Sequence, residues 1–126
     1  MQEASPTHGA ILVVDDVPEM RLLLKDWLEG LGYSVLEAED GEAATEVAQS
    51  RLPKFILMDI GLPKQSGISA VYRIRKHPGL QNVPIVAMTA YTNPDLYQEA
   101  IKAGCVEVLT KPLDTDRLKK LLNNLL

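Results

Sequence analysis

Cysteine is almost missing from this sequence. The 126-residue chain has one cysteine, Cys105, so it forms no intramolecular disulfide and no CxxC metal site. Chains without disulfides are typical of reducing compartments. We therefore expect a cytoplasmic protein.

An excess of basic residues and a long apolar run are missing as well. Thirteen Lys and Arg face seventeen Asp and Glu, a formal net charge of −4, whereas phosphate-backbone binding needs a basic surface. No stretch approaches the roughly 18 consecutive apolar residues of a membrane span. We expect no direct nucleic-acid partner and no membrane insertion.

The length predicts one domain without a separate output domain. Residues 1–9 are polar and lack the basic and apolar regions of a signal peptide, so we expect a flexible lead-in. The predicted domain covers residues 10–126.

From residue 10 onward, short apolar runs alternate with helical patterns. The runs are nearly continuous and partly β-branched, which is typical of parallel strands buried on both faces. They cover residues 10–14, 33–38, 55–58, 85–88 and 106–109. The clearest helical stripe consists of Met20, Leu23, Leu24, Trp27, Leu28 and Leu31. Five such repeats predict an α/β fold, a five-stranded parallel sheet with helices on both faces.

Helix signals agree with this pattern. The expected N-caps are Asp40, Ser66 and Asn93, the expected first-turn prolines are Pro18 and Pro94, and the expected helix stops are Gly32 and Gly104.

Carboxylates follow the first and third runs. Ligands of such folds bind beyond the carboxyl ends of the strands. Asp15 and Asp16 follow the first run and predict either a divalent-metal site, suited to Mg²⁺, or a turn that caps the next helix. Asp59 ends the third run and is a candidate phosphoryl-accepting nucleophile, with a metal ligand or a loop cap as the alternatives.

A hydroxyl and an ammonium follow the last two runs. Thr89, followed by the small Ala90, could donate to a bound oxyanion or only bond the backbone. Lys111 could be a counter-ion, a phosphate contact or a solvated side chain, and the bond to Pro112 could be cis or trans. Together these groups predict a site where a cation and a lysine neutralise phosphoryl oxygens.

The motifs resemble the receiver domain of two-component response regulators, a CheY-like module. The matching segments are Asp15-Asp16, residues 58–63 with Gly67, residues 88–90, and residues 110–112. Their order and spacing match from residue 10 to residue 126. The resemblance implies a three-layer, flavodoxin-like (βα)5 fold.

The resemblance also implies a role for each site residue. Asp59 would be the phosphoacceptor, and Mg²⁺ would be held by Asp16 directly, by Asp15 through water, by Asp59 and by the carbonyl of Gly61. Thr89 would be the switch hydroxyl. Lys111 would contact the phosphoryl group, and Ala90 would offer its backbone N–H to it.

The implied function is signalling by phosphorylation. The donor would be a histidine kinase or a histidine phosphotransfer protein, and the output would pass to a protein partner through the fourth helix, fifth strand and fifth helix. Phosphorylation-dependent dimerisation is an open alternative for the output. The chain would catalyse only its own phosphorylation and dephosphorylation, so we do not expect a conventional enzyme.

Two positions depart from the family. The aromatic switch residue that often stands three positions before the lysine is Val108 here, which puts its coupling to Thr89 in doubt. Two positions after Thr89 stands Tyr91, which we expect to shield the acyl phosphate from water.

Three other functions fit the residues less well. A haloacid-dehalogenase-like phosphatase needs a second carboxylate where Gly61 stands, together with a cap domain. A flavodoxin-like small-molecule binder needs a Gly/Ser/Thr-rich loop after the first strand. A degenerate, unphosphorylated receiver would lack site residues that are all present here.

Four remaining features have structural interpretations. We expect Trp27 in the core or between helices, and Cys105 as a small buried apolar residue. His77 should interact with a helix C-terminus. The basic cluster of Arg73, Arg75 and Lys76 should be a solvated helix face.

Overall fold

The computed structural model describes residues 9–61, 67–90 and 93–126, where strands and helices alternate along the chain. The strands are β1 (Ala10–Val14), β2 (Ser34–Ala38), β3 (Phe55–Asp59), β4 (Ile85–Thr89) and β5 (Glu107–Thr110). The helices are α1 (Pro18–Gly30), α2 (Gly41–Arg51), α3 (Gly67–Lys76), α4 (Pro94–Ala103) and α5 (Thr115–Leu125), with a 3₁₀ turn at Pro78–Leu80. Each predicted strand lies within one residue of the observed bounds.

All five strands run parallel in one sheet, in the order β2-β1-β3-β4-β5. β1, β3 and β4 are interior strands, and all their apolar residues from Ile11 onward are buried. Since parallel strands end at the same edge, this order brings the ends of β1, β3 and β4 side by side. The predicted α/β fold, with a parallel five-stranded sheet and helices on both faces, is confirmed.

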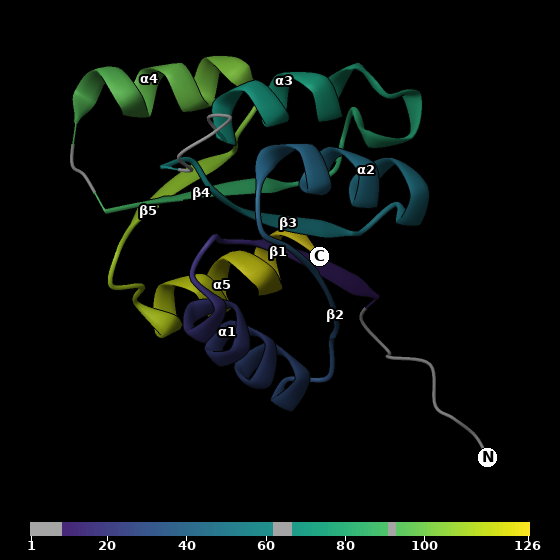
Figure 1. Ribbon diagram of the computed structural model, residues 1–126. Helices are drawn as coiled ribbons and strands as arrows, with labels where there is room; N and C mark the ends of the chain where they lie inside the picture. Colours follow the sequence, from purple (N-terminus) through teal and green to yellow (C-terminus); the bar gives the residue numbers. More distant parts are fainter. Residues whose placement is uncertain (1–8, 62–66, 91–92) are drawn as a thin grey trace.

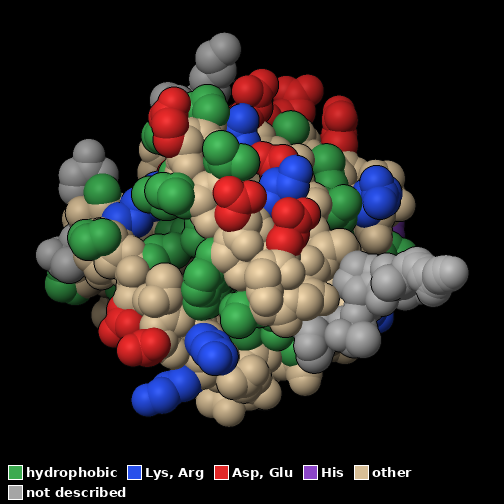
Figure 2. Space-filling view, turned by 90° about the horizontal axis from the view of Figure 1, so that it is seen from below, with side chains coloured by type: hydrophobic (Ala, Val, Ile, Leu, Met, Phe, Trp, Pro, Cys, Tyr) green, Lys and Arg blue, Asp and Glu red, His purple; other side chains and the backbone are tan. Residues whose placement is uncertain are grey.

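Helices cover both faces of the sheet, as Figure 1 shows, with α1 and α5 on one face and α2, α3 and α4 on the other. Seen from the α1–α5 side, exposed hydrophobic side chains lie among acidic and basic ones (Figure 2). No helix in the described ranges has the length and apolar composition to cross a membrane.

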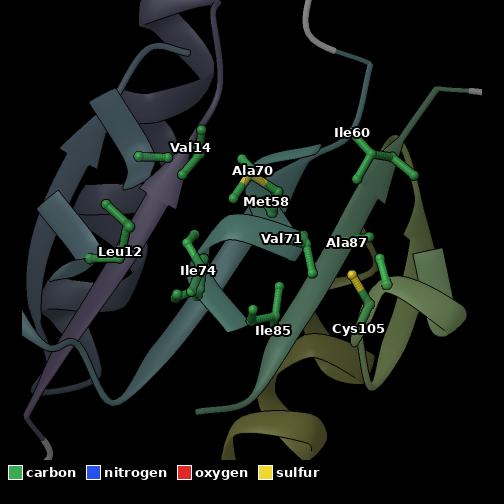
Figure 3. Packing of buried hydrophobic residues seen from close by; sticks show 14 of the residues in the cluster. Leu12, Val14, Met58, Ile60, Ala70, Val71, Ile74, Ile85, Ala87 and Cys105 are labelled. Atoms are coloured by element: carbon green, nitrogen blue, oxygen red, sulfur yellow. The ribbon is translucent and has the colours of Figure 1, made fainter. Parts of the chain in front are cut away.

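The sheet separates two hydrophobic clusters. The cluster under α2, α3 and α4 includes Leu12, Met58 and Ile85 from the sheet and Ile74 from α3, and Figure 3 shows its packing. The cluster under α1 and α5 contains Phe55, Leu28 and Leu118 among others. Alternate residues of each interior strand therefore point into different clusters, which explains the continuous apolar runs.

The predicted helix ends are largely confirmed. Asp40 accepts a hydrogen bond from Ala43 N at 2.8 Å, and Asn93 accepts one from Asp95 N at 2.9 Å. The two prolines occupy first turns, at the starts of α1 and α4. Gly104 follows α4 with φ of 126°. Ser66, the third expected cap, lies outside the described residues.

The predicted stripe of α1 is wider than the face that packs. Leu24 and Leu28 are buried and Trp27 packs beside them, as predicted, but Leu23 is 66% exposed. A 13-residue helix on a twisted sheet contacts it along a narrow line, so Leu23 falls outside the contact.

The prediction of a solvated basic face at the end of α3 is wrong for Arg75. Arg75 is not on a solvated face: its guanidinium donates to Gly104 O at 2.6 Å and to Leu80 O at 2.9 Å. Gly104 lies 29 residues further along the chain, so only the folded chain brings its carbonyl near Arg75. His77 Nδ1 accepts from Gly79 N at 3.2 Å, so this side chain caps the 3₁₀ turn that follows α3.

The expected burial of Cys105 is confirmed, with 4% exposure. Burial raises the pKa of this thiol to about 11, and the nearby Arg75 charge opposes the rise only in part.

Candidate functional site

The acidic residues meet at the carboxyl edge of the sheet. Asp59 ends β3, and Asp15 follows β1, the neighbouring strand. Asp15, Asp16 and Asp59 each offer a carboxylate oxygen, and these oxygens lie within 4.8 Å of one another. Asp15 and Asp59 are buried, at 0% and 5% exposure, whereas Asp16 is exposed. The cluster is thus open to solvent on the Asp16 side.

Each buried carboxylate accepts a local backbone hydrogen bond. Asp59 Oδ1 accepts from Gly61 N at 2.8 Å, and Asp15 Oδ1 accepts from Val17 N at 2.9 Å. These bonds leave the second oxygen of each carboxylate, Oδ2, for contacts with other groups. The carbonyl of Gly61 is the predicted metal ligand, and it is the N–H of this residue that bonds Asp59.

Lys111 joins the two buried carboxylates. Its Nζ donates to Asp15 Oδ2 at 2.8 Å and to Asp59 Oδ2 at 3.0 Å. Burial alone would lower the pKa of Lys111, but the hydrogen bonds and charges of Asp15 and Asp59 outweigh burial, so the pKa is raised. The prediction that Lys111 stands beside carboxylates is confirmed. The Lys111-Pro112 bond is cis.

Thr89 and Ala90 lie at the end of β4. Thr89 is buried at 2% exposure, and its carbonyl accepts a hydrogen bond from Lys111 N at 2.7 Å. That bond ties the end of β4 to the lysine that contacts the carboxylates. Ala90 is exposed just beyond Thr89. Tyr91, the expected shield, lies outside the described residues.

A mainly apolar cavity of about 390 Å³ lies beside Thr89, between α4 and β5. Val108 and Thr110 line it from β5, and Leu96 and Tyr97 line it from α4. Val108 is the position where the family often has an aromatic residue, and its short side chain leaves this space open. A larger hollow of about 780 Å³ lies at the opposite edge, near the starts of β1, β3 and β4.

Arg21 is a site neighbour that the sequence reasoning missed. Its guanidinium donates to the carbonyl oxygen of Asp15 at 2.7 Å. The residue occurs in the helical pattern of α1 without any motif around it, so no local signal marks it. Only the fold shows that the side chain turns back toward the carboxyl end of β1.

The donor set fits a small divalent cation. Carboxylate oxygens are hard ligands of the kind Mg²⁺ prefers, and Mg²⁺ usually keeps several waters. The exposed side chain of Asp16 leaves access for such waters. Three carboxylates and an ammonium are therefore together at one sheet edge.

The parallel sheet with this acidic edge defines a flavodoxin-like α/β domain with a candidate metal centre. The chain belongs to the response regulator receiver domain family, whose model matches residues 11–123. It is thus a receiver domain of two-component signalling, as its motifs predict.

Individual relatives agree with the family. The chain is 36% identical to chemotaxis protein CheY of Thermotoga maritima over 114 residues, covering 90% of this chain and 93% of that protein. The solved structure of Vibrio cholerae CheY4 superposes with a TM-score of 0.89 at 30% identity, covering 95% of this chain and 100% of that one.

A third relative carries a metal. The receiver domain of sensor histidine kinase PA1611 from Pseudomonas aeruginosa was solved with magnesium coordinated in its active-site cleft. It superposes with a TM-score of 0.86 at 32% identity, covering 94% of this chain and 98% of that one.

Proposed function

We propose that this receiver domain accepts a phosphoryl group on Asp59 from a phosphohistidine of a histidine kinase or a histidine phosphotransfer protein. The observation that supports this most is the position of Asp59, a buried carboxylate held by Lys111 and Gly61 N–H and adjacent to Asp15 and Asp16. A carboxylate oxygen of Asp59 forms the new P–O bond while the P–N bond of the donor breaks. The electron pair of the P–N bond stays on the imidazole nitrogen.

Asp15, Asp16 and Asp59, with the carbonyl of Gly61, would hold Mg²⁺. The bound ion would supply positive charge to the phosphoryl oxygens. The exposed Asp16 leaves this side of the site accessible to solvent and to the incoming donor. The receiver domain of PA1611, with magnesium in its cleft, supports the same assignment by likeness.

Lys111, Thr89 and Ala90 would stabilise the product. An acyl phosphate brings about −1.5 to −2 charges to the site if it behaves like other phosphates. The Lys111 ammonium already lies 3.0 Å from Asp59 Oδ2, so little rearrangement is needed to contact a phosphoryl oxygen. The Thr89 hydroxyl and the Ala90 N–H would bind the others and draw the end of β4 toward Asp59.

The output would pass through protein contacts. The cavity between α4 and β5 gives the end of β4 room to move. We propose that a downstream partner binds the α4-β5-α5 face, with a phosphorylation-dependent dimer as the alternative output. The domain would work in the cytoplasm and would catalyse only its own phosphorylation and dephosphorylation.

The test is to incubate the protein with Mg²⁺ and acetyl phosphate and to follow its intact mass. We expect the mass of one phosphoryl group to be added, and Asp59→Asn and EDTA to prevent the addition. Asp26→Asn is the matched control, because Asp26 is an exposed carboxylate on α1. Absence of an adduct with both acetyl phosphate and a cognate kinase would contradict the proposal.

A further inference from the structure

Arg21 connects the metal-site loop to the sheet. Its side chain is only 17% exposed, although α1 lies on the surface. One end of the guanidinium donates to Asp15 O at 2.7 Å, and Nε lies 3.5 Å from Glu37 Oε1 on β2. Glu37 pairs in register with Val13 of β1, so the contact joins the loop after β1 to the neighbouring strand.

The loop from Asp15 to Val17 is held at both ends: Lys111 Nζ donates to the Asp15 carboxylate at 2.8 Å, and Arg21 N donates to Val17 O at 3.1 Å. Val17 is the N-cap of α1 without a side-chain capping bond, and Pro18 at the first position has no N–H to donate. Asp15 N donates to Ala38 O at 3.2 Å, and Val17 N donates to the Asp15 carboxylate. Asp16 lies between these anchors, with its side chain in solvent.

We propose that Arg21 is a positioning residue for the metal centre: it holds the Asp15 carbonyl so that the carboxylates of Asp15 and Asp16 converge with that of Asp59. The proposal rests on the proposed Mg²⁺ site. Arg21 itself does not bind the ion, because its guanidinium is a cation and only donates hydrogen bonds. Its effect passes through the backbone of Asp15.

Removal of the Arg21 side chain should change Mg²⁺ affinity in opposite directions if the residue acts through its charge or through positioning. A cation close to a divalent-ion site repels the ion, so its loss should tighten Mg²⁺ binding. Positioning predicts weaker binding, because the carboxylates lose their alignment. The sign of the change therefore separates the two explanations.

Lys25 provides the matched control. It lies one turn further along α1, and its Nζ is 3.8 Å from Glu37 Oε2. Lys25→Met removes the same charge and a contact to the same Glu37, but it leaves the Asp15 carbonyl bond intact. The experiment compares Arg21→Met, Arg21→Lys and Lys25→Met with the unchanged protein.

Mg²⁺ alone is titrated into each protein, and binding is followed by amide chemical shifts in NMR spectra. We expect Arg21→Met to weaken binding about tenfold, the lower end for groups that orient metal ligands. We expect Arg21→Lys to recover part of the loss and Lys25→Met to bind equally well or slightly more tightly. Urea unfolding of each variant establishes that the folded state is titrated.

Phosphorylation by acetyl phosphate gives a second measurement. With Arg21→Met, the Mg²⁺ concentration for half-maximal rate should rise while the rate at saturating Mg²⁺ stays near that of the unchanged protein. If folded Arg21→Met binds Mg²⁺ as tightly as the unchanged protein or more tightly, the inference about Arg21 is overturned while the proposed metal site stands. If the unchanged protein binds no Mg²⁺, the proposed metal site fails and the inference fails with it.

Discussion

Gly67 allows α3 to begin directly against the backbone at the end of β3, the strand that carries Asp59. A Cβ atom at this position would lie 2.7 Å from Ile60 Cα and closer still to the carbonyl oxygen of Asp59. Carbon atoms pack favourably at about 3.5–4.0 Å, so the two backbone segments would have to separate by about 1 Å. We therefore predict that Gly67→Ala destabilises the protein and displaces Asp59.

Overpacking of this kind costs about 1–3 kcal/mol, and backbone on both sides leaves no flexible side chain to give way. Gly30→Ala is the control, because nothing lies within 4 Å of a Cβ at the end of α1. Alanine there should stabilise by about 0.5–1 kcal/mol, since glycine is the poorer helix residue. The two substitutions add the same methyl group with opposite expected signs.

Urea unfolding followed by circular dichroism measures both free energies, and intact mass measures phosphorylation by acetyl phosphate. We expect the Gly67→Ala protein to unfold at lower urea and to gain the phosphoryl group more slowly. Equal stability of Gly67→Ala and the unchanged protein would refute the steric argument. Lower stability with an unchanged phosphorylation rate would show that α3, and not Asp59, moves.

Three other substitutions test separate parts of the structure. Burial raises the pKa of the Cys105 thiol from 9.0 to about 11. Between pH 9 and pH 11 the unfolded chain loses the thiol proton whereas the folded protein keeps it, so the free energy of unfolding falls by up to about 3 kcal/mol over this range. Cys105→Ala should flatten the dependence of the urea midpoint on pH in that window, and an unchanged slope would contradict this assignment. Lys111→Met leaves the carboxylates of Asp15 and Asp59 without their ammonium partner and should cost about 1–3 kcal/mol at pH 7. Mg²⁺ should recover part of the stability that this variant loses. An equal loss of stability with and without Mg²⁺ would show that Mg²⁺ and the Lys111 ammonium do not share the site. Asn93→Ala removes the α4 cap and should cost about 1 kcal/mol by urea unfolding, and a neutral result would mean that solvent satisfies those N–H groups equally well.

Much of the fold could be predicted because hydrophobic periodicity acts locally. An interior strand such as β3 (Phe55–Asp59) is buried along its whole length, so its sequence is an uninterrupted apolar run ending in Asp59. The edge strand β2 is less buried and contains Glu37, yet its β-branched and apolar residues still mark it. Strand ends in parallel sheets share one edge, which is why the acidic cluster could be placed without coordinates.

Contacts between distant turns could not be predicted in this way. Arg75 reaches Gly104 O, 29 residues later, and such a carbonyl carries no sequence signal because every residue has one. Arg21 contacts the Asp15 carbonyl for the same reason, unmarked by any motif. Leu23 shows the converse error: its spacing is helical, but the contact line between α1 and the sheet decides its burial.

The sheet order has a consequence for amide hydrogen exchange. Asp15, Asp59 and Thr89 extend from β1, β3 and β4, each of which has hydrogen-bonded neighbours on both sides. Amides of these strands should exchange with deuterium only when the whole domain unfolds, whereas the edge strands β2 and β5 should exchange through local opening. The carboxylates and the hydroxyl are thus attached to the slowest-exchanging segments. We expect Lys111, which follows the edge strand β5, to be attached to a segment that opens more readily.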